Sequence, residues 1–429
     1  MDDIYQTFED ADGNFLEQFQ STAFDARLFE LYLFTYFERS GYKLDRTHAY
    51  PDFLVTRGDK TVAVEATTVN PPTSGAMKEL GKTISDLNAV ELRDYERHEL
   101  AIRFGSPLFS KLQKRYWELP HCHNIPIVIA IEAFHDENSL SLSDKSLMSY
   151  VYGSEVAASW DADGTLQVSA HGIDDHRLGP KTIPSNFFSQ PDAEHIAAIM
   201  FTNSGTSAKF SRMGFQHGFG CDEVEITRWG FFFMPDHEAM DPAFFSYNLS
   251  SPPLVETWGQ GLVVMHNPNC LHPVPEGFFV DSVQARKNGD HVVTEHLSWH
   301  PFSSKTQIFG LGETKKELEQ VLSLRRPPFT VHPITRQAFE RATAFASNGN
   351  PLVHEDGWFG DDSGSFLGVV IKDKSDNDWG YVVLARDPYF HFRAIDVASC
   401  MTSRAEARET LQLAIARLLC APKRIFGQD

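Results

Sequence analysis

The segment Tyr50–Val69, YPDFLVTRGDKTVAVEATTV, decides the fold prediction because it contains two short apolar strands joined by the turn Gly58-Asp59. In a two-residue type II′ turn with glycine first, residues whose numbers sum to 117 face each other, so Asp52 lies opposite Glu65. Directly opposed residues have Cβ atoms about 4.5–5.5 Å apart, and like charges at that spacing destabilise the pair. We therefore expect something to offset the repulsion.

The same register gives the hairpin two apolar faces. Leu54 and Ala63 share the face of the two acids. The opposite face carries Phe53, Val55, Val62, Val64 and Ala66. Two buried carboxylates side by side either take up a proton or share a cation, and oxygen ligands suit a divalent ion such as Mg²⁺ or Mn²⁺. Asp52 and Glu65 are therefore the predicted metal ligands, and the alternative is a pair of exposed acids on edge strands.

The patterns around the hairpin predict an α/β protein with a mixed central sheet. An apolar run over residues 22–39 predicts a buried helix, and YKLDRTH over residues 42–48 predicts a strand before the hairpin. Residues 78–103 and 106–117 predict helices. The continuous apolar run IPIVIAIEAF over residues 125–134 predicts a strand covered on both faces.

Glu30 is an ionisable residue in the middle of the first helical pattern, where a charge needs a partner. Arg27, one turn earlier, could pair with it. The other interpretation is that Glu30 acts together with Asp52 and Glu65 by orienting a second metal ion or a metal-bound water. The sequence leaves both interpretations open.

These features resemble the PD-(D/E)XK restriction-endonuclease-like superfamily over residues 20–135. The motif positions of that superfamily are occupied here by Pro51-Asp52, by Glu65-Ala66-Thr67 and, on the first helix, by Glu30. The resemblance implies a mixed sheet flanked by helices, acids that hold one or two Mg²⁺ ions, and a lysine that helps to activate the attacking water. It implies hydrolysis of a phosphodiester bond, with Mg²⁺ or Mn²⁺ as cofactor.

Thr67 stands where the superfamily has its lysine, and a hydroxyl cannot supply the positive charge that stabilises the transition state. The superfamily tolerates a lysine from elsewhere, and SKLQKRYW over residues 110–117 offers two on a following helix. We expect Thr67 or Lys111 to position the nucleophile, and Lys111, Lys114 and Arg115 to contact the phosphate backbone. The alternative is that these cations form a solvated helix face.

The chain divides into three regions. Residues 1–138 form the predicted nuclease-like core. Residues 139–323 are rich in Pro and Gly, and they either extend the first sheet or form a second lobe. Strand-like runs in this region are IAAIMFTN, RWGFFFMP and GLVVMH. LRRPPFTVHP has the composition of a linker, and residues 324–429 predict a small α+β accessory domain with several strands and a helix over residues 404–419.

Composition limits the function classes. The 429 residues carry a formal net charge of −20, which weighs against a broad basic surface for nucleic acid but leaves room for a local patch. Five widely spaced cysteines signal neither a disulfide framework nor a zinc site. The absence of a signal-peptide pattern and of a long apolar run predicts a cytoplasmic protein without a membrane segment.

Two functions follow as hypotheses. The first is a Mg²⁺-dependent endonuclease that acts on nucleic acid, DNA rather than RNA, as a monomer or homodimer. Analogy with the superfamily suggests host defence or DNA restriction. The second is a catalytically inactive nuclease-like fold that binds nucleic acid or protein, which Thr67 and the acidic net charge favour.

Overall fold

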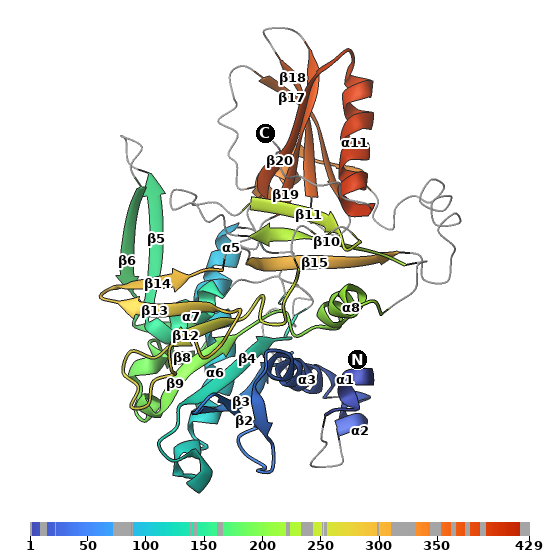
Figure 1. The fold of residues 1–429 in the computed structure, drawn as a ribbon. Coiled ribbons are helices and arrows are strands. Elements are labelled where there is room, and N and C mark those ends of the chain that lie inside the picture. The colour runs from blue at the N-terminus through green and yellow to red at the C-terminus, as the bar shows by residue number, and fades with distance from the viewer. Residues whose placement is uncertain are drawn as a thin grey trace.

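The protein is seen in a computed structural model, which describes residues 2–8, 15–21, 23–71, 87, 89–136, 139, 144–160, 166–219, 224–232, 243–250, 252, 255–297, 300–309, 331–343, 353–361, 366–373, 378–386 and 392–420. A mixed sheet with helices on both faces occupies one end of the molecule, and two antiparallel sheets with one long helix occupy the other (Figure 1). The predicted α/β class with a mixed central sheet flanked by helices is confirmed.

The central sheet has eight strands in the order β1-β2-β3-β4-β9-β12-β13-β14. Their bounds are β1 Lys43–Asp45, β2 Phe53–Arg57, β3 Lys60–Val69, β4 Ile127–Ala133, β9 Ile196–Phe201, β12 Val263–His266, β13 Val283–Asn288 and β14 His291–Glu295. Strands β3, β4 and β9 are parallel, whereas β12 runs antiparallel to β9. The sheet therefore continues well beyond residue 138, and two of the three strand-like runs in the next region belong to it.

The predicted hairpin register is confirmed. Phe53 pairs with Val64 and Arg57 pairs with Lys60, so partner numbers sum to 117 as expected. Gly58 has φ +62°, the positive value that the first residue of a type II′ turn requires. One face of the hairpin packs in the core beneath α6, and the other packs in the core beneath α3. Both faces are apolar because each is covered by a helix.

Helix α3, Phe24–Arg39, covers one face of the sheet, and every residue from Leu28 to Phe37 is buried. The hydroxyls of Tyr32 and Tyr36 donate to the backbone oxygens of Trp258 and Val280, each at 2.8 Å. These bonds explain how a helix that is apolar all round keeps its few polar atoms satisfied. The prediction of a buried helix here is confirmed.

The opposite face is covered by one continuous helical run, α5 Ala89–Asp94, the π-helical turn η2 Tyr95–Leu100 and α6 Ala101–Leu112. The prediction of two helices separated near Gly105, with the second extending to residue 117, is therefore wrong. Gly105 does not break the helix but permits close packing, because a Cβ there would lie 2.7 Å from Ile183 Cδ1 and 2.9 Å from the hydroxyl oxygen of Tyr150. The part of the prediction over residues 78–86 and 88 lies outside the described residues.

A three-stranded sheet and a five-stranded sheet form the second half of the molecule. The first consists of β10 Glu225–Phe232, β11 Ala243–Asn248 and β15 Pro301–Phe309. The second consists of β16 Val331–Ile334, β17 Val353–Asp361, β18 Phe366–Asp373, β19 Trp379–Arg386 and β20 Phe392–Met401, with α11 Arg404–Cys420 packed on it. The two sheets share a core, in which the rings of Trp229 and Phe366 lie 5.2 Å apart. The predicted C-terminal strands and helix are confirmed, and residues 324–330 of the expected linker lie outside the described residues.

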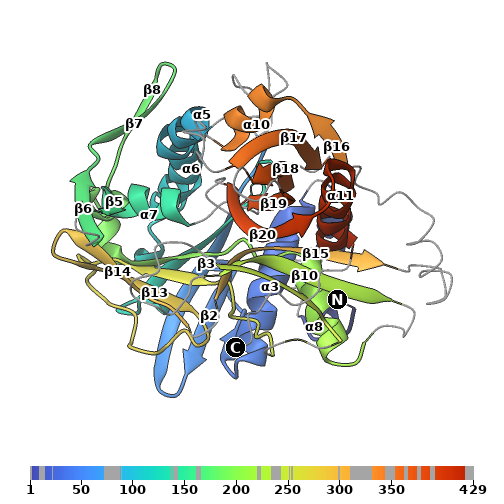
Figure 2. The same cartoon turned by 90° about the horizontal axis from the view of Figure 1, so that it is seen from above.

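The remaining elements surround these sheets, and Figure 2 shows the β7–β8 hairpin projecting from the periphery. They are α1 Asp2–Tyr5, α2 Phe15–Phe19, η3 Tyr116–Glu118, η4 Pro120–Cys122, α7 Lys145–Tyr152, β5 Ser154–Trp160, β6 Leu166–Gly172, β7 Asp175–Leu178, β8 Lys181–Pro184, η6 Phe187–Ser189, η7 Ala193–His195, α8 Ser207–Gln216 and α10 Arg336–Thr343. Within the described ranges, no helix is both long and apolar enough for a membrane crossing.

Candidate active site

Asp52 and Glu65 lie side by side on the face of the central sheet that α6 covers. The backbone N–H of Asp52 donates to Glu65 Oε2 at 3.2 Å, and the N–H of Ala66 donates to Asp52 Oδ2 at 2.7 Å. Glu65 is 1% exposed, whereas Asp52 is of intermediate exposure. The register predicted from the Gly58-Asp59 turn thus brings both acids together.

Lys111 supplies a positive charge to this pair. It lies in the last turn of α6, and its Nζ is 2.5 Å from Glu65 Oε1. Its side chain is 24% exposed, so the ammonium group lies between the buried acid and solvent. The positive charge beside Glu65 therefore comes from the helix that packs over this face of the sheet.

The charge balance at the site remains negative, because one ammonium group faces two carboxylates. Burial and, to a smaller extent, the charge of Glu65 raise the pKa of Asp52 to about 7, whereas the hydrogen bond from Ala66 and the charge of Lys111 oppose the rise. Among the described residues, no donor reaches Asp52 Oδ1. Two adjacent carboxylates with an open oxygen suit a hard divalent cation such as Mg²⁺ or Mn²⁺. The residues present fit the predicted metal.

Tyr116 is a further residue of the site, to which the sequence analysis gave no role. It is buried in the turn η3 that follows α6. Burial raises the pKa of Tyr116, and the charge of Glu65 raises the pKa further. Both causes favour the neutral, protonated hydroxyl. The sequence could not predict that Tyr116 lies near Glu65, because helix α6 ends between Lys111 and Tyr116 and helical spacing no longer relates the two residues.

The other predicted residues on this side of the sheet are placed less favourably. Thr67 is half-buried on β3 and shares the face of Glu65. Lys114 and Arg115 are exposed just beyond α6, but Arg115 pairs with Glu118 at 2.6 Å and with Asp192 at 2.8 Å. Arg115 is therefore already engaged, whereas Lys114 makes no ion pair with any residue in the described part of the chain.

Glu30 makes no hydrogen bond with Asp52 or Glu65, although its charge is among the smaller causes, after burial and Glu65, that raise the pKa of Asp52. It lies on α3, which covers the other face of the sheet, and its carboxylate oxygens lie 2.5 Å from Arg27 Nη1 and 2.7 Å from Arg46 Nη2. The ion-pair interpretation of Glu30 is confirmed, with Arg46 as an additional partner. Two arginines that flank one buried carboxylate satisfy it without a metal ion.

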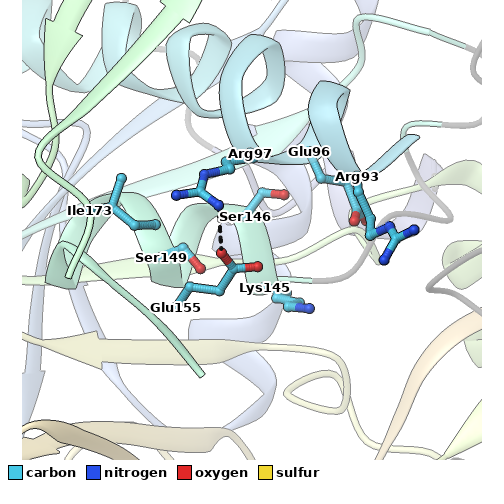
Figure 3. A pocket seen from close by; sticks show the side chains of 8 residues that line it. All are labelled: Arg93, Glu96, Arg97, Lys145, Ser146, Ser149, Glu155 and Ile173. Carbon is cyan, nitrogen blue, oxygen red and sulfur yellow. Dashed lines mark ion pairs between the residues drawn. The ribbon is translucent and has the colours of Figure 1, made fainter. Parts of the chain in front are cut away.

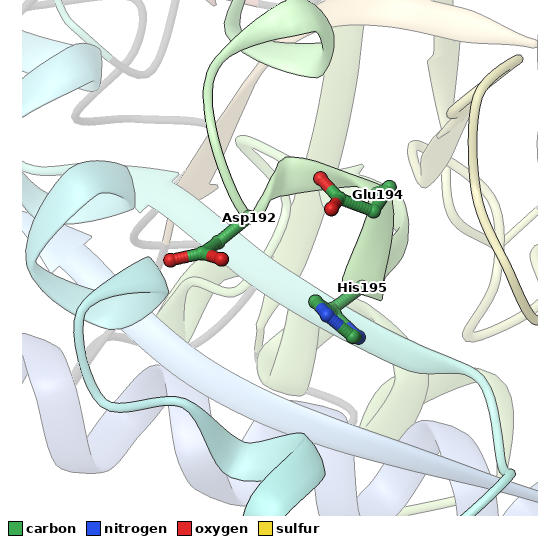
Figure 4. Close-up of side chains that lie close together, drawn as sticks. All are labelled: Asp192, Glu194 and His195. Carbon is green, nitrogen blue, oxygen red and sulfur yellow. The ribbon is translucent and has the colours of Figure 1, made fainter.

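A second group of ligand-type side chains lies in the loop before β9. Asp192, Glu194 and His195 have ligand atoms within 4.8 Å of one another, and Figure 4 shows them gathered at this loop. This group could bind a metal ion. Asp192 already accepts from Arg115, and the ring of His195 stacks on Trp117 with centroids 4.3 Å apart. The run D-A-E-H was the available sequence signal, since it places three ligand types in four residues.

A small cavity of about 60 Å³ lies apart from the acids, between η2, α7 and β5 (Figure 3). Its lining residues are Arg93, Glu96, Arg97, Lys145, Ser146, Ser149, Glu155 and Ile173. Arg97 and Glu155 form an ion pair of 3.5 Å at its edge. Side chains of both charge signs line this cavity, which has room for about two waters. Its volume is far below the few hundred Å³ that small-molecule pockets need.

Glu132 is a third acid in the central sheet, and it is fully buried on β4. Its Oε1 accepts from the N–H of Gly205 at 2.8 Å, whereas Oε2 has no hydrogen-bond partner in the described part of the protein. Burial raises the pKa of Glu132 well above its usual range, and the charge of Asp25 adds to the rise. Burial therefore favours the protonated form of Glu132.

We expect Glu132→Gln to raise the free energy of unfolding at pH 8 relative to the wild type. The folded pKa of Glu132 lies above the unfolded one, so the wild type loses stability as the pH rises from about 4.5, by up to about 1.4 kcal/mol per pH unit. A neutral amide avoids this loss. Urea unfolding at pH 5 and pH 8 should show a larger gain at pH 8, and an equal effect at both pH values would contradict a protonated Glu132.

A buried charge cluster links α8 to β10 of the three-stranded sheet through Glu256. Lys209 Nζ lies 2.8 Å from Glu256 Oε1, Arg212 Nε lies 2.8 Å from Oε2, and Arg228 Nη1 lies 3.3 Å from Oε2. All four side chains are buried. Burial and the neighbouring arginines lower the pKa of Lys209 to about 7, and Glu256 opposes that change. The partners come from distant segments, so no local pattern could reveal the cluster.

No protein-family model, no curated protein and no solved structure matches this chain.

Proposed function

We propose that the protein is a Mg²⁺-dependent nuclease that hydrolyses phosphodiester bonds in nucleic acid, DNA rather than RNA. The observation that carries the proposal is the placement of Lys111 Nζ 2.5 Å from Glu65 Oε1, beside Asp52. Two carboxylates and an ammonium group on one face of a hairpin supply the metal ligands and the positive charge that phosphodiester hydrolysis needs. Their arrangement supports a nuclease that takes its lysine from α6.

Each residue of the site has a task in this proposal. Asp52 and Glu65 would hold the cation, and a bound Mg²⁺ lowers the pKa of water and polarises a phosphate oxygen. Lys111 donates a hydrogen bond at the solvent side of Glu65, where a phosphate oxygen can approach it. Tyr116 would lie near Glu65 as a buried, uncharged side chain. Thr67 lies two residues after Glu65 on the same face of β3, where its hydroxyl could hold a water.

By analogy with the superfamily, the proposal includes a cytoplasmic role in host defence or restriction, with the C-terminal α+β unit as an accessory domain. The second candidate is an inactive nuclease-like module that binds nucleic acid or protein. One observation favours that candidate specifically: the ion pair between Lys111 and Glu65 neutralises Glu65 without a metal. The two candidates differ in whether a metal ion binds and whether a phosphodiester bond is then cut.

We expect Lys111→Gln to lower cleavage by about 10²–10³-fold, because it removes the positive charge beside the reacting phosphate. Lys111→Arg should retain more activity, since it keeps the charge. Lys60→Gln is the matched control, because Lys60 is an exposed lysine at the turn end of the same hairpin and should change cleavage little. The measurement is the initial rate on plasmid and on single-stranded DNA with Mg²⁺ or Mn²⁺.

The same assay separates the two candidate functions. The nuclease proposal requires that Mg²⁺ or Mn²⁺ raise the melting temperature of the wild type and that DNA be cut in their presence. A melting temperature that neither ion changes, together with intact substrates, supports the inactive module. Equal rates for Lys111→Gln and Lys60→Gln would show that Lys111 takes no part in the chemistry.

A further inference from the structure

Two exposed rings and one half-buried ring lie in and against the segment that precedes Asp52. Tyr50 precedes Pro51-Asp52 directly and is 59% exposed. The Nε2–H of His121 donates to the backbone oxygen of Tyr50 at 2.7 Å, which fixes the position of this segment. The ring of His121 stacks on that of His48, with centroids 3.7 Å apart and planes 5° from parallel. Three flat rings therefore lie beside the candidate catalytic acids.

The turn that follows α6 connects these rings to the acids. Its Tyr116 is buried, and the electrostatic influence of Tyr50 is among the smaller causes, after burial and Glu65, that raise the pKa of Tyr116. The next residue, Trp117, is half-buried, with the guanidinium carbon of Arg115 at 5.2 Å from its ring centroid. Arg115, Tyr116 and Trp117 thus place a cation and two aromatic rings next to one another in the turn after α6.

The charge of the protein argues against binding that depends on many phosphate contacts. The chain carries a net charge of −20, and Arg115 is already paired with two acids. Duplex DNA is bound mainly through cations that neutralise its phosphates. Single-stranded nucleic acid offers another source of affinity, because each base that stacks on an aromatic side chain contributes about 1–3 kcal/mol.

From these observations we propose that the site takes single-stranded or unpaired nucleic acid, whose bases stack on Tyr50 and on the His48–His121 pair next to Asp52. The inference rests on the proposed nuclease function and names the form of its substrate. Stacking is tolerant of sequence because every base has an aromatic face. The proposal therefore concerns strandedness and not sequence.

The test measures binding of the full chain without metal, so that nothing is cut. The probe is a short fluorescent oligonucleotide without self-complementarity, used single-stranded as DNA and as RNA, and annealed to its complement as a duplex. Anisotropy titrations should show that single strands bind more tightly than the duplex. Tyr50→Ala should weaken single-strand binding by about 5- to 150-fold, the loss of one stacked base, whereas Tyr50→Trp should restore it.

Phe219→Ala is the matched control, because Phe219 is 60% exposed and follows α8, far from Asp52 in sequence and fold. It should leave binding unchanged. Duplex binding as tight as single-strand binding, or an equal effect of Tyr50→Ala and Phe219→Ala, would overturn the inference, and so would the absence of binding to any single strand.

A cleavage assay with Mg²⁺ separates this inference from the function on which it rests. If Tyr50→Ala binds and cuts single-stranded DNA as well as the wild type does, the nuclease function stands and the single-strand inference fails. If single strands bind through Tyr50 and no substrate is cut, the inference about the bound form stands and the nuclease function fails.

Discussion

Asp52→Asn should abolish the rise in melting temperature that Mg²⁺ gives the wild type, and should lower DNA cleavage by about 10³-fold or more. No described residue donates a hydrogen bond to Oδ1 of Asp52, so this oxygen beside Glu65 is available to a metal ion. The amide of an asparagine at position 52 carries no charge and is a weaker metal ligand than the carboxylate. A metal present at a hundredfold excess over its Kd stabilises a folded protein by about 2.7 kcal/mol. Differential scanning fluorimetry with and without Mg²⁺ measures the effect directly.

Asp59→Asn is the control for this change. Asp59 is a fully exposed acid at the turn of the same hairpin, and it is paired only with its neighbour Lys60 in the described structure. Its substitution should leave both the metal-dependent stabilisation and cleavage as in the wild type. If Asp52→Asn and Asp59→Asn respond alike to Mg²⁺, the two opposed acids do not form the metal site.

Without metal, Asp52→Asn should have the opposite effect on stability and raise the free energy of unfolding at pH 8. Burial and Glu65 raise the pKa of Asp52 from 3.8 to about 7, so the unfolded chain loses this proton at lower pH than the folded protein does. The wild type consequently loses stability as the pH rises through that interval. Urea unfolding in a chelating buffer at pH 5 and pH 8 should show a gain that is clearly larger at the higher pH.

The features that the sequence could predict are local ones. The register of the hairpin follows from the positions of Gly58 and Asp59, and alternation then places Asp52 and Glu65 on one face. The buried helix α3 and strand β4 follow from unbroken apolar runs of different length. These inferences need contacts only within a few residues or within one hairpin.

The features that the sequence could not predict depend on how distant segments pack. Lys111 reaches Glu65 only because α6 crosses the hairpin, and the sequence offered it as one of several cations. Arg46 pairs with Glu30 because β1 places it beside α3, a contact that no local pattern could reveal. Gly105 reads as a helix break, yet close packing against Tyr150 explains it better.

Glu256→Ala should be the most destabilising single substitution in the described part of the protein, with a loss of about 3–5 kcal/mol. It would leave Lys209, Arg212 and Arg228 buried with no carboxylate between them. The exposed acid Glu276 is the matched control, and Glu276→Ala should change the free energy of unfolding by less than about 0.5 kcal/mol. Urea unfolding of the two variants measures the difference.

A pH series and a double variant test the electrostatic origin of that loss. Without Glu256, the pKa of Lys209 in the folded protein should fall below its value of about 7. Between that lower pKa and the unfolded value of 10.5, Lys209 is protonated in the unfolded chain but not in the folded protein. Stability of Glu256→Ala should therefore recover as the pH rises through this interval. Replacing Lys209 by methionine in the same chain removes one unpaired cation and should restore part of the loss at pH 7. A loss that neither alkaline pH nor Lys209→Met reduces would indicate that Glu256 acts through packing instead of charge.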